Sequence, residues 1–204
     1  MNRPDGVSKK EYNALCAQAE QLHKKDPDCR RKDNVDFFLY LVTVVVVLLA
    51  IRLVIGEPIR VDGPSMTPTL LHNERMVVEK LSYCFHPPQR GDIIICYYPG
   101  YTESCVKRVI GLPGETVEIV YGIVYIDGEP LDESAYWDDI IYGDMEPVVV
   151  PEKSVFVMGD NRNRSQDSRA PEVGSIPYEK VSGRAAWVVW PLSDARVIPH
   201  EDYR

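Results

Sequence analysis

The stretch DIIICYYPGYTESCVKRVIGLPGETVEIVYGIVYIDG, residues 92–128, decides the fold class of this chain. It consists of short apolar runs rich in β-branched residues, separated by glycine and proline. The Tyr-Gly and Asp-Gly steps at 121–122 and 127–128 are typical of tight turns between paired strands. Strands are expected at residues 75–79, 92–98, 105–110, 116–120, 123–126, 154–158 and 183–190. Because such runs follow one another with little helical periodicity, the part of the chain after residue 56 is predicted to be mainly β.

Residues 115–150 stand out within this β region. They begin with two closely spaced strand runs and continue into the acidic, irregular stretch LDESAYWDDIIYGDMEP. We expect this segment to form a small, hairpin-rich β subdomain that departs from the main sheet.

An apolar run of membrane length precedes the β region. Residues 37–51 read FFLYLVTVVVVLLAI, and residues 53–55 extend the run if Arg52 snorkels, which gives 19 positions. About 20 apolar residues span a bilayer. A buried core helix would rarely be so rich in valine, and a cleaved signal sequence would lie nearer the N-terminus. We therefore predict one transmembrane helix at 37–55, between a tail (1–36, with helical character at 9–24) and a domain at 56–204.

Charge predicts the orientation of this helix and excludes one class of partner. Lysine and arginine cluster before the run, whereas only Arg52 and Arg60 lie close after its core. The tail should therefore be cytoplasmic and the domain at 56–204 extracytoplasmic. From Glu57 onward the chain has 24 acidic and 14 basic residues, so nucleic acid is not an expected partner.

Ser65 and Lys107 are the candidate catalytic residues. Ser65 lies in VDGPSMTPTL (61–70), where Pro64 restricts the backbone and Gly63 would allow a substrate to approach closely. A serine hydroxyl needs a base, and a buried lysine can serve when its pKa is lowered. Taken alone, Ser65 could be an ordinary turn serine and Lys107 an edge-strand lysine.

Cysteine and histidine give weaker signals. Of five cysteines, Cys84, Cys96 and Cys105 follow the apolar run. Cys96 and Cys105 could pair across a hairpin, which the sequence alone leaves open. The histidines have no metal-like spacing, so no metal site is expected.

Four segments in order resemble the signature boxes of bacterial type I signal peptidases. They are VDGPSMTPTL (61–70), RGDIII (90–95), VKRVIGLPGE (106–115) and MGDNRNRSQDSR (158–169). The resemblance implies a signal-peptidase-type β fold and a membrane-bound serine endopeptidase that removes N-terminal signal peptides from exported preproteins. It implies a Ser–Lys dyad without metal or cofactor, and a single-pass location in the bacterial cell membrane.

The same resemblance assigns roles to individual residues. Ser65 would be the nucleophile, with its own amide in the oxyanion hole, and Lys107 the general base. Ser165 would hydrogen-bond the lysine amine, Asp167 and Arg169 would form a supporting ion pair, and Asp160 and Asn161 would shape the preceding turn. Gly63 replaces a serine that supplies an oxyanion donor in Gram-negative members. This departure resembles the Gram-positive branch and leaves the second donor unidentified.

Substrate recognition is also implied by the resemblance. The preprotein would add as a strand beside the serine segment and offer small residues at the first and third positions before the cut. Shallow apolar pockets would be formed by Ile59, Val61, Met66, Leu70 and Val106. The lipid bilayer is an expected partner, and the Sec translocon is a candidate one.

Two other functions share parts of this pattern. Self-cleaving repressors of the LexA type also use Ser–Lys pairs on a β fold, but they are soluble and carry a DNA-binding helical domain. A catalytically silent binding module could keep the fold and the apolar run, although it would be expected to lack Ser65 or Lys107.

Overall fold

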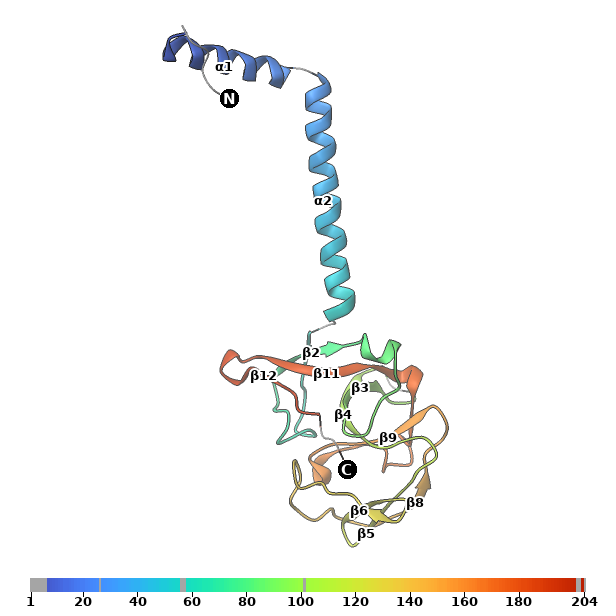
Figure 1. Ribbon diagram of the computed structural model, residues 1–204. Coiled ribbons are helices and arrows are strands. Elements are labelled where there is room, and N and C mark those ends of the chain that lie inside the picture. Colours follow the sequence, from blue (N-terminus) through green and yellow to red (C-terminus); the bar gives the residue numbers. More distant parts are fainter. Residues whose placement is uncertain (1–6, 26, 56–57, 101, 201–202, 204) are drawn as a thin grey trace. The chain divides into compact units, whose positions relative to one another are not determined.

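Two α-helices, two antiparallel sheets and four short 3-10 helices, Ser82–Cys84, Arg162–Arg164, Tyr178–Lys180 and Leu192–Asp194, make up the described part of the chain (Figure 1). The computed structural model describes residues 7–25, 27–55, 58–100, 102–200 and 203. The chain divides into two units, Met1–Ala50 and Ile51–Arg204.

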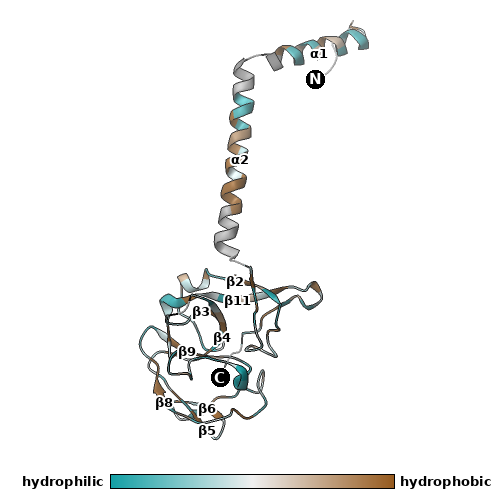
Figure 2. Ribbon diagram, turned by 180° about the vertical axis from the view of Figure 1, so that it is seen from behind, coloured by the Kyte–Doolittle hydropathy of each residue, from teal (hydrophilic) through white to brown (hydrophobic). Residues whose placement is uncertain are grey.

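The helices belong to the N-terminal part of the chain. Helix α1 (Lys9–Lys25) covers the predicted helical tail, and Ser8 and Glu11 exchange hydrogen bonds at its start as a capping box. Helix α2 (Pro27–Ile55) begins with proline, which is tolerated in the first helical turn. The middle of α2 is hydrophobic (Figure 2). No helix in the described part of the chain is at once long enough and apolar enough to cross a membrane.

The main sheet has eight strands, all paired antiparallel. Its order is β1-β2-β11-β3-β4-β9-β10, with β12 paired to β11. The strands are β1 (Pro58–Arg60), β2 (Arg75–Glu79), β3 (Ile93–Tyr97), β4 (Ser104–Gly111), β9 (Ser154–Met158), β10 (Ile176–Pro177), β11 (Val181–Trp190) and β12 (Arg196–Val197). Strand β4, which carries Lys107, lies between β3 and β9 near the centre of this order.

A second sheet of four strands forms between residues 116 and 149. Its order is β7-β6-β5-β8, and its strands are β5 (Thr116–Val120), β6 (Ile123–Ile126), β7 (Glu129–Pro130) and β8 (Met145–Val149). It lies at the opposite end of the β domain from β2 and β11 (Figures 1 and 2). The predicted strands at 75–79, 116–120, 123–126 and 154–158 have these limits in the structure, and the mainly β prediction is confirmed.

Buried side chains form three apolar clusters, and one of them anchors the segment that carries Ser65. Val61, Met66 and Leu70 pack in that cluster with strands β2, β3 and β11. A second cluster joins β4 and β9 to the second sheet, and Phe156 is fully buried in it. The serine segment is therefore held by the core of the main sheet on both sides of Ser65.

Phe156→Ala should lower the free energy of unfolding by about 3–5 kcal/mol, because it removes a wholly buried ring between the two sheets. Denaturant unfolding of the purified protein measures this change. Val149→Ala, at a side chain that is 62% exposed, is the control and should change stability by no more than about 0.5 kcal/mol. Equal effects of the two substitutions would contradict the packing of Phe156 in a shared core.

Candidate active site

Ser65 lies in a tight turn between β1 and β2. Thr67 N donates to Pro64 O at 3.1 Å, and Leu70 N donates to Met66 O at 2.8 Å. Gly63 has φ +90°, a conformation that favours glycine, and a Cβ there would meet no atom within 4 Å. Ser65 itself is half-buried, while Met66 is 1% exposed. The turn presents the hydroxyl while the residue after it anchors the backbone.

Lys107 reaches Ser65 from the centre of the main sheet. It faces Ile94 across the β3–β4 pair and is 4% exposed. Its Nζ donates to Ser65 Oγ at 3.0 Å and to Val106 O at 3.0 Å. The two residues predicted to be catalytic are thus in direct contact, although 42 residues separate them in the chain.

Burial lowers the pKa of the Lys107 amine below its usual value, because the charged form is poorly solvated there. The negative charges of Cys105, Asp167 and Asp160 act in the opposite direction, and that of Cys105 is the largest. The net effect favours the neutral amine. A neutral amine 3.0 Å from a serine hydroxyl is suited to accept its proton.

The loop after β9 fixes the serine turn from the other side. Asn161 N donates to Ser65 O at 3.0 Å, and Gly159 N donates to Asp167 Oδ2 at 2.9 Å. A Cβ at Gly159 would lie 2.5 Å from Ser165 Cβ and 2.5 Å from Ser65 O. Only glycine allows the loop to approach both serines this closely.

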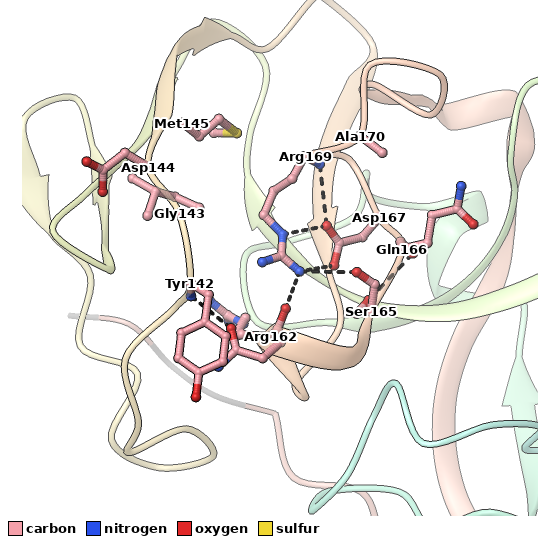
Figure 3. Close-up of a pocket in the computed structure, with 12 residues that line it drawn as sticks. Tyr142, Gly143, Asp144, Met145, Arg162, Ser165, Gln166, Asp167, Arg169 and Ala170 are labelled. Atoms are coloured by element: carbon pink, nitrogen blue, oxygen red, sulfur yellow. Dashed lines mark hydrogen bonds and ion pairs between the residues drawn. The ribbon is translucent and has the colours of Figure 1, made fainter.

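Asp167 and Arg169 form an ion pair with Nε–Oδ1 at 2.8 Å, and Asp167 is 1% exposed. Figure 3 shows the Arg169 guanidinium with bonds to Asp167 and to the backbone oxygens of Arg162 and Ser165. These residues line one side of a cavity of about 320 Å³ whose other side includes Tyr142, Gly143 and Met145. Ser65 and Lys107 are not among its lining residues.

The Ser165 hydroxyl differs from expectation. It donates to Gln166 O at 3.5 Å, whereas the hydrogen bonds described for the Lys107 amine go to Ser65 and Val106. Gly159 lies between the Ser165 side chain and the Ser65 carbonyl, so Ser165 lies near the serine turn without bonding to the lysine.

A buried ionic network that begins at Arg108, the residue after Lys107, was not predicted from the sequence. Arg108 and Asp160 are both 0% exposed and form two hydrogen bonds of 2.7 Å. The Tyr136 ring lies 4.1 Å from the Arg108 guanidinium, and Arg162 pairs with Glu133. The only signal in the sequence was the arginine next to Lys107. The alternation of side chains along a strand cannot show that this arginine pairs with Asp160, which is 52 residues away.

The five predicted pocket residues come together in one cluster. Val61, Met66 and Leu70 are at most 2% exposed, whereas Ile59 and Val106 are partly buried and pack against them. Near them, Gly63 N donates to His72 Nδ1 at 3.1 Å. Among the residues that the structure describes, no three histidine, cysteine or acidic side chains gather as metal ligands.

The structure thus places a serine hydroxyl in contact with a buried lysine amine on an antiparallel β framework, and hydrolases are known that use such Ser–Lys pairs. The comparisons with known proteins define the class further. Residues 34–190 match the family model described as signal peptidase, peptidase S26.

Relatives compared by sequence agree with this match. The chain is 43% identical over 170 residues to a probable signal peptidase I-1 of Synechocystis. This alignment covers 79% of this chain and 84% of the Synechocystis protein. It is 36% identical over 183 residues to signal peptidase I S of Bacillus subtilis. This alignment covers 85% of this chain and 98% of the Bacillus protein. A crystal structure of a signal peptidase I from Enterococcus faecalis, 36% identical, superposes with a TM-score of 0.43 over 50% of this chain and 98% of that one.

The chain belongs to the signal peptidase, peptidase S26 family. It is a hydrolase of the signal peptidase I class.

Gly159→Ala should displace Ser165 or the Ser65 turn, because the added methyl group would overlap both. We expect a loss of about 1–3 kcal/mol in the free energy of unfolding and a fall in kcat for signal-peptide cleavage, measured by denaturant unfolding and by peptide hydrolysis. Adding Ser165→Gly removes one of the two overlaps and should recover part of the stability. A Gly159→Ala variant with unchanged stability and kcat would contradict the close approach.

Proposed function

We propose that this protein is a membrane-bound serine endopeptidase that removes N-terminal signal peptides from exported preproteins by means of a Ser65–Lys107 dyad. The observation that carries the proposal is the 3.0 Å contact between the Ser65 hydroxyl and a lysine amine that is 4% exposed. Membership of the signal peptidase family supplies the reaction, and the contact supplies the residues.

The proposed reaction follows from the chemistry of these two groups. The neutral Lys107 amine accepts the Ser65 proton as the hydroxyl oxygen attacks the scissile carbonyl. The resulting ammonium then protonates the leaving amine, and an ester remains on Ser65. The regenerated amine activates a water molecule that hydrolyses this ester, so one base serves both halves of the reaction.

The tetrahedral oxyanion needs hydrogen-bond donors beside Ser65. The amide of Ser65 is the proposed first donor, and a missing donor typically costs about 10²-fold or more in kcat. Gly63 has no side chain to contribute, and its amide already donates to His72. The second donor in this chain therefore has to come from a group other than the Gly63 side chain.

The residues around the dyad have proposed supporting roles. Asp167 and Arg169, through their ion pair and the bond from Gly159 to Asp167, hold the loop whose Asn161 amide binds the Ser65 carbonyl. Ser165 is proposed to orient the Lys107 amine during the reaction, which requires its hydroxyl to turn from Gln166 toward the lysine.

Substrate selection is proposed to depend on shallow apolar pockets beside the serine segment. Ile59 and Val106 keep exposed surface, whereas Val61, Met66 and Leu70 form the packed floor beneath them. Because these three buried side chains fill the space below the surface, the pockets above them are shallow and have room for small substrate side chains only. This arrangement supports a preference for small residues at the first and third positions before the cut, with the substrate paired as an added strand.

The apolar run at 37–55 is proposed to anchor the enzyme in the bacterial cell membrane, with the tail at 1–36 inside and the domain at 56–204 outside. The whole run lies within α2, and the large apolar side chains described along it, such as Phe37, Tyr40 and Leu48, are exposed. An anchor confines enzyme and membrane-inserted preprotein to one plane, which raises their effective concentration. The bilayer and the Sec translocon are its proposed neighbours.

Ser65→Ala and Lys107→Ala should each lower kcat/KM for a preprotein with an Ala-x-Ala site by about 10⁴-fold or more. In the wild type, activity should rise with pH through the lowered pKa of Lys107, because the protonated amine cannot act as a base. Cleavage by the purified protein in detergent, measured from pH 5 to pH 10, gives both results.

Lys180→Ala removes an exposed lysine and serves as the control for loss of positive charge. It should leave the rate and the pH profile unchanged. Cleavage that survives Lys107→Ala would refute the assignment of the base.

Removing residues 1–55 should slow the processing of a membrane-inserted preprotein more than the cleavage of a soluble peptide, because only the first reaction benefits from confinement to a plane. Paired assays in liposomes and in solution measure the two rates. Equal losses in both assays would count against the anchor.

A further inference from the structure

Cys96 and Cys105 form a second pair of reactive groups, two positions along the β3–β4 pairing from Lys107. They face each other directly across strands β3 and β4, and their Sγ atoms lie 3.8 Å apart. Both thiols are free. Facing residues of antiparallel strands have Cα atoms about 4.5–5.5 Å apart, within the range that a disulfide requires.

The two thiols differ in the way that thiol–disulfide exchange requires. Cys105 is half-buried, whereas Cys96 is buried. A hydrogen bond from the Cys96 thiol lowers the pKa of Cys105 to about 7 against the opposing effect of burial, and the Lys107 amine lowers it further when that amine is protonated. The same contact and burial raise the pKa of Cys96. Cys105 is therefore the attacking thiolate and Cys96 the resolving thiol.

Cys105 also influences the lysine. The two residues are two positions apart on β4, so their side chains share one face of the strand. The groups around them are Cys96 from β3, Tyr98 just after β3, Ser65 from the serine turn, and Asp160 and Asp167 from the loop after β9. Among the charges that raise the pKa of Lys107 against burial, the Cys105 thiolate is the largest.

We propose that Cys96 and Cys105 form a reversible redox site beside the Ser65–Lys107 pair, and that closing their disulfide removes a negative charge from the surroundings of the Lys107 amine. The effect on catalysis rests on the proposed function of Lys107. Disulfide formation itself depends only on the two thiols.

The reaction balances with a small-molecule disulfide as oxidant. The Cys105 thiolate attacks one sulfur of glutathione disulfide and releases one glutathione thiolate. Cys96 then gives up its proton and attacks the Cys105 sulfur, which releases the second glutathione. The two cysteines are oxidised by two electrons, and glutathione disulfide is reduced to two thiols. An extracytoplasmic domain, as proposed here, would meet oxidising conditions that favour this state.

The test uses the full chain with Cys16, Cys29 and Cys84 replaced by serine, so that only the proposed pair remains. Glutathione disulfide should cause the loss of two hydrogen atoms in mass, reversed by dithiothreitol. The titration of Lys107, followed as its reactivity toward a small acylating reagent across pH, should move to lower pH in the oxidised form. A shift of half a unit leaves about threefold more neutral amine on the acidic side, and the acidic limb of cleavage should move with it.

Two matched variants distinguish the pair from a lone thiol. In Cys105→Ser, Lys107 should titrate at the lower pH expected of the oxidised form even without an oxidant. Glutathione disulfide should then cause no further change. Cys96→Ser should gain the mass of one glutathione instead of losing two hydrogens.

The proposal is overturned if the pair stays reduced in glutathione disulfide, or if the disulfide closes and the Lys107 titration does not move. If the Lys107 titration moves but neither redox form cleaves a preprotein at any pH, the redox site stands and the proposed function fails. The two failures therefore give different results.

Discussion

The buried charge of Arg108 has to be balanced inside the protein, and Asp160 is the group that balances it. Both side chains are fully shielded from water, and breaking such a pair leaves an uncompensated charge in the interior. Because Arg108 belongs to β4 and Asp160 to the loop after β9, the pair fixes the distance between the strand that carries Lys107 and the loop that binds the Ser65 carbonyl. Together with the β4–β9 pairing and the Asp167–Arg169 ion pair, it supports the contact between Ser65 and Lys107.

Pairing also explains how two aspartates can lie near the lysine while its pKa stays low. Asp160 and Asp167 both favour the charged amine, and burial opposes them. Each aspartate is bound to an arginine, Asp160 to Arg108 and Asp167 to Arg169, so much of its charge is compensated locally. The protein can therefore use these carboxylates as structural supports, while desolvation remains the largest influence on Lys107.

The sequence predicted local features better than long-range ones. The strands at 116–120, 123–126 and 154–158 were evident because each is a short apolar run between turn residues. Strand β8 was missed, because most of its side chains are exposed and it contains Pro147. Its pairing with β5 is a tertiary contact that no local pattern reports.

The same difference applies to the candidate site. Ser65 and Lys107 could be named from their motifs, and the structure places them in contact. The orientation of the Ser165 hydroxyl and the contact of Tyr136 with Arg108 could not be predicted, because each depends on where a distant segment crosses the site. Side-chain direction in an irregular loop has no periodicity from which it could be inferred.

Tyr136 gives the segment at 115–150 a structural role in the main sheet, because its ring packs on Arg108 of β4. Its ring covers Arg108, and its hydroxyl donates to Glu133 and accepts a hydrogen bond from Tyr203, so this segment completes the ionic network beside the strand that carries Lys107. Variation in the length of the segment is therefore not equally tolerable along it. A change of length is expected to be tolerated best near Tyr121, which is 87% exposed, and least in the stretch from Glu133 to Tyr136, which packs against Arg108 on the strand that carries Lys107.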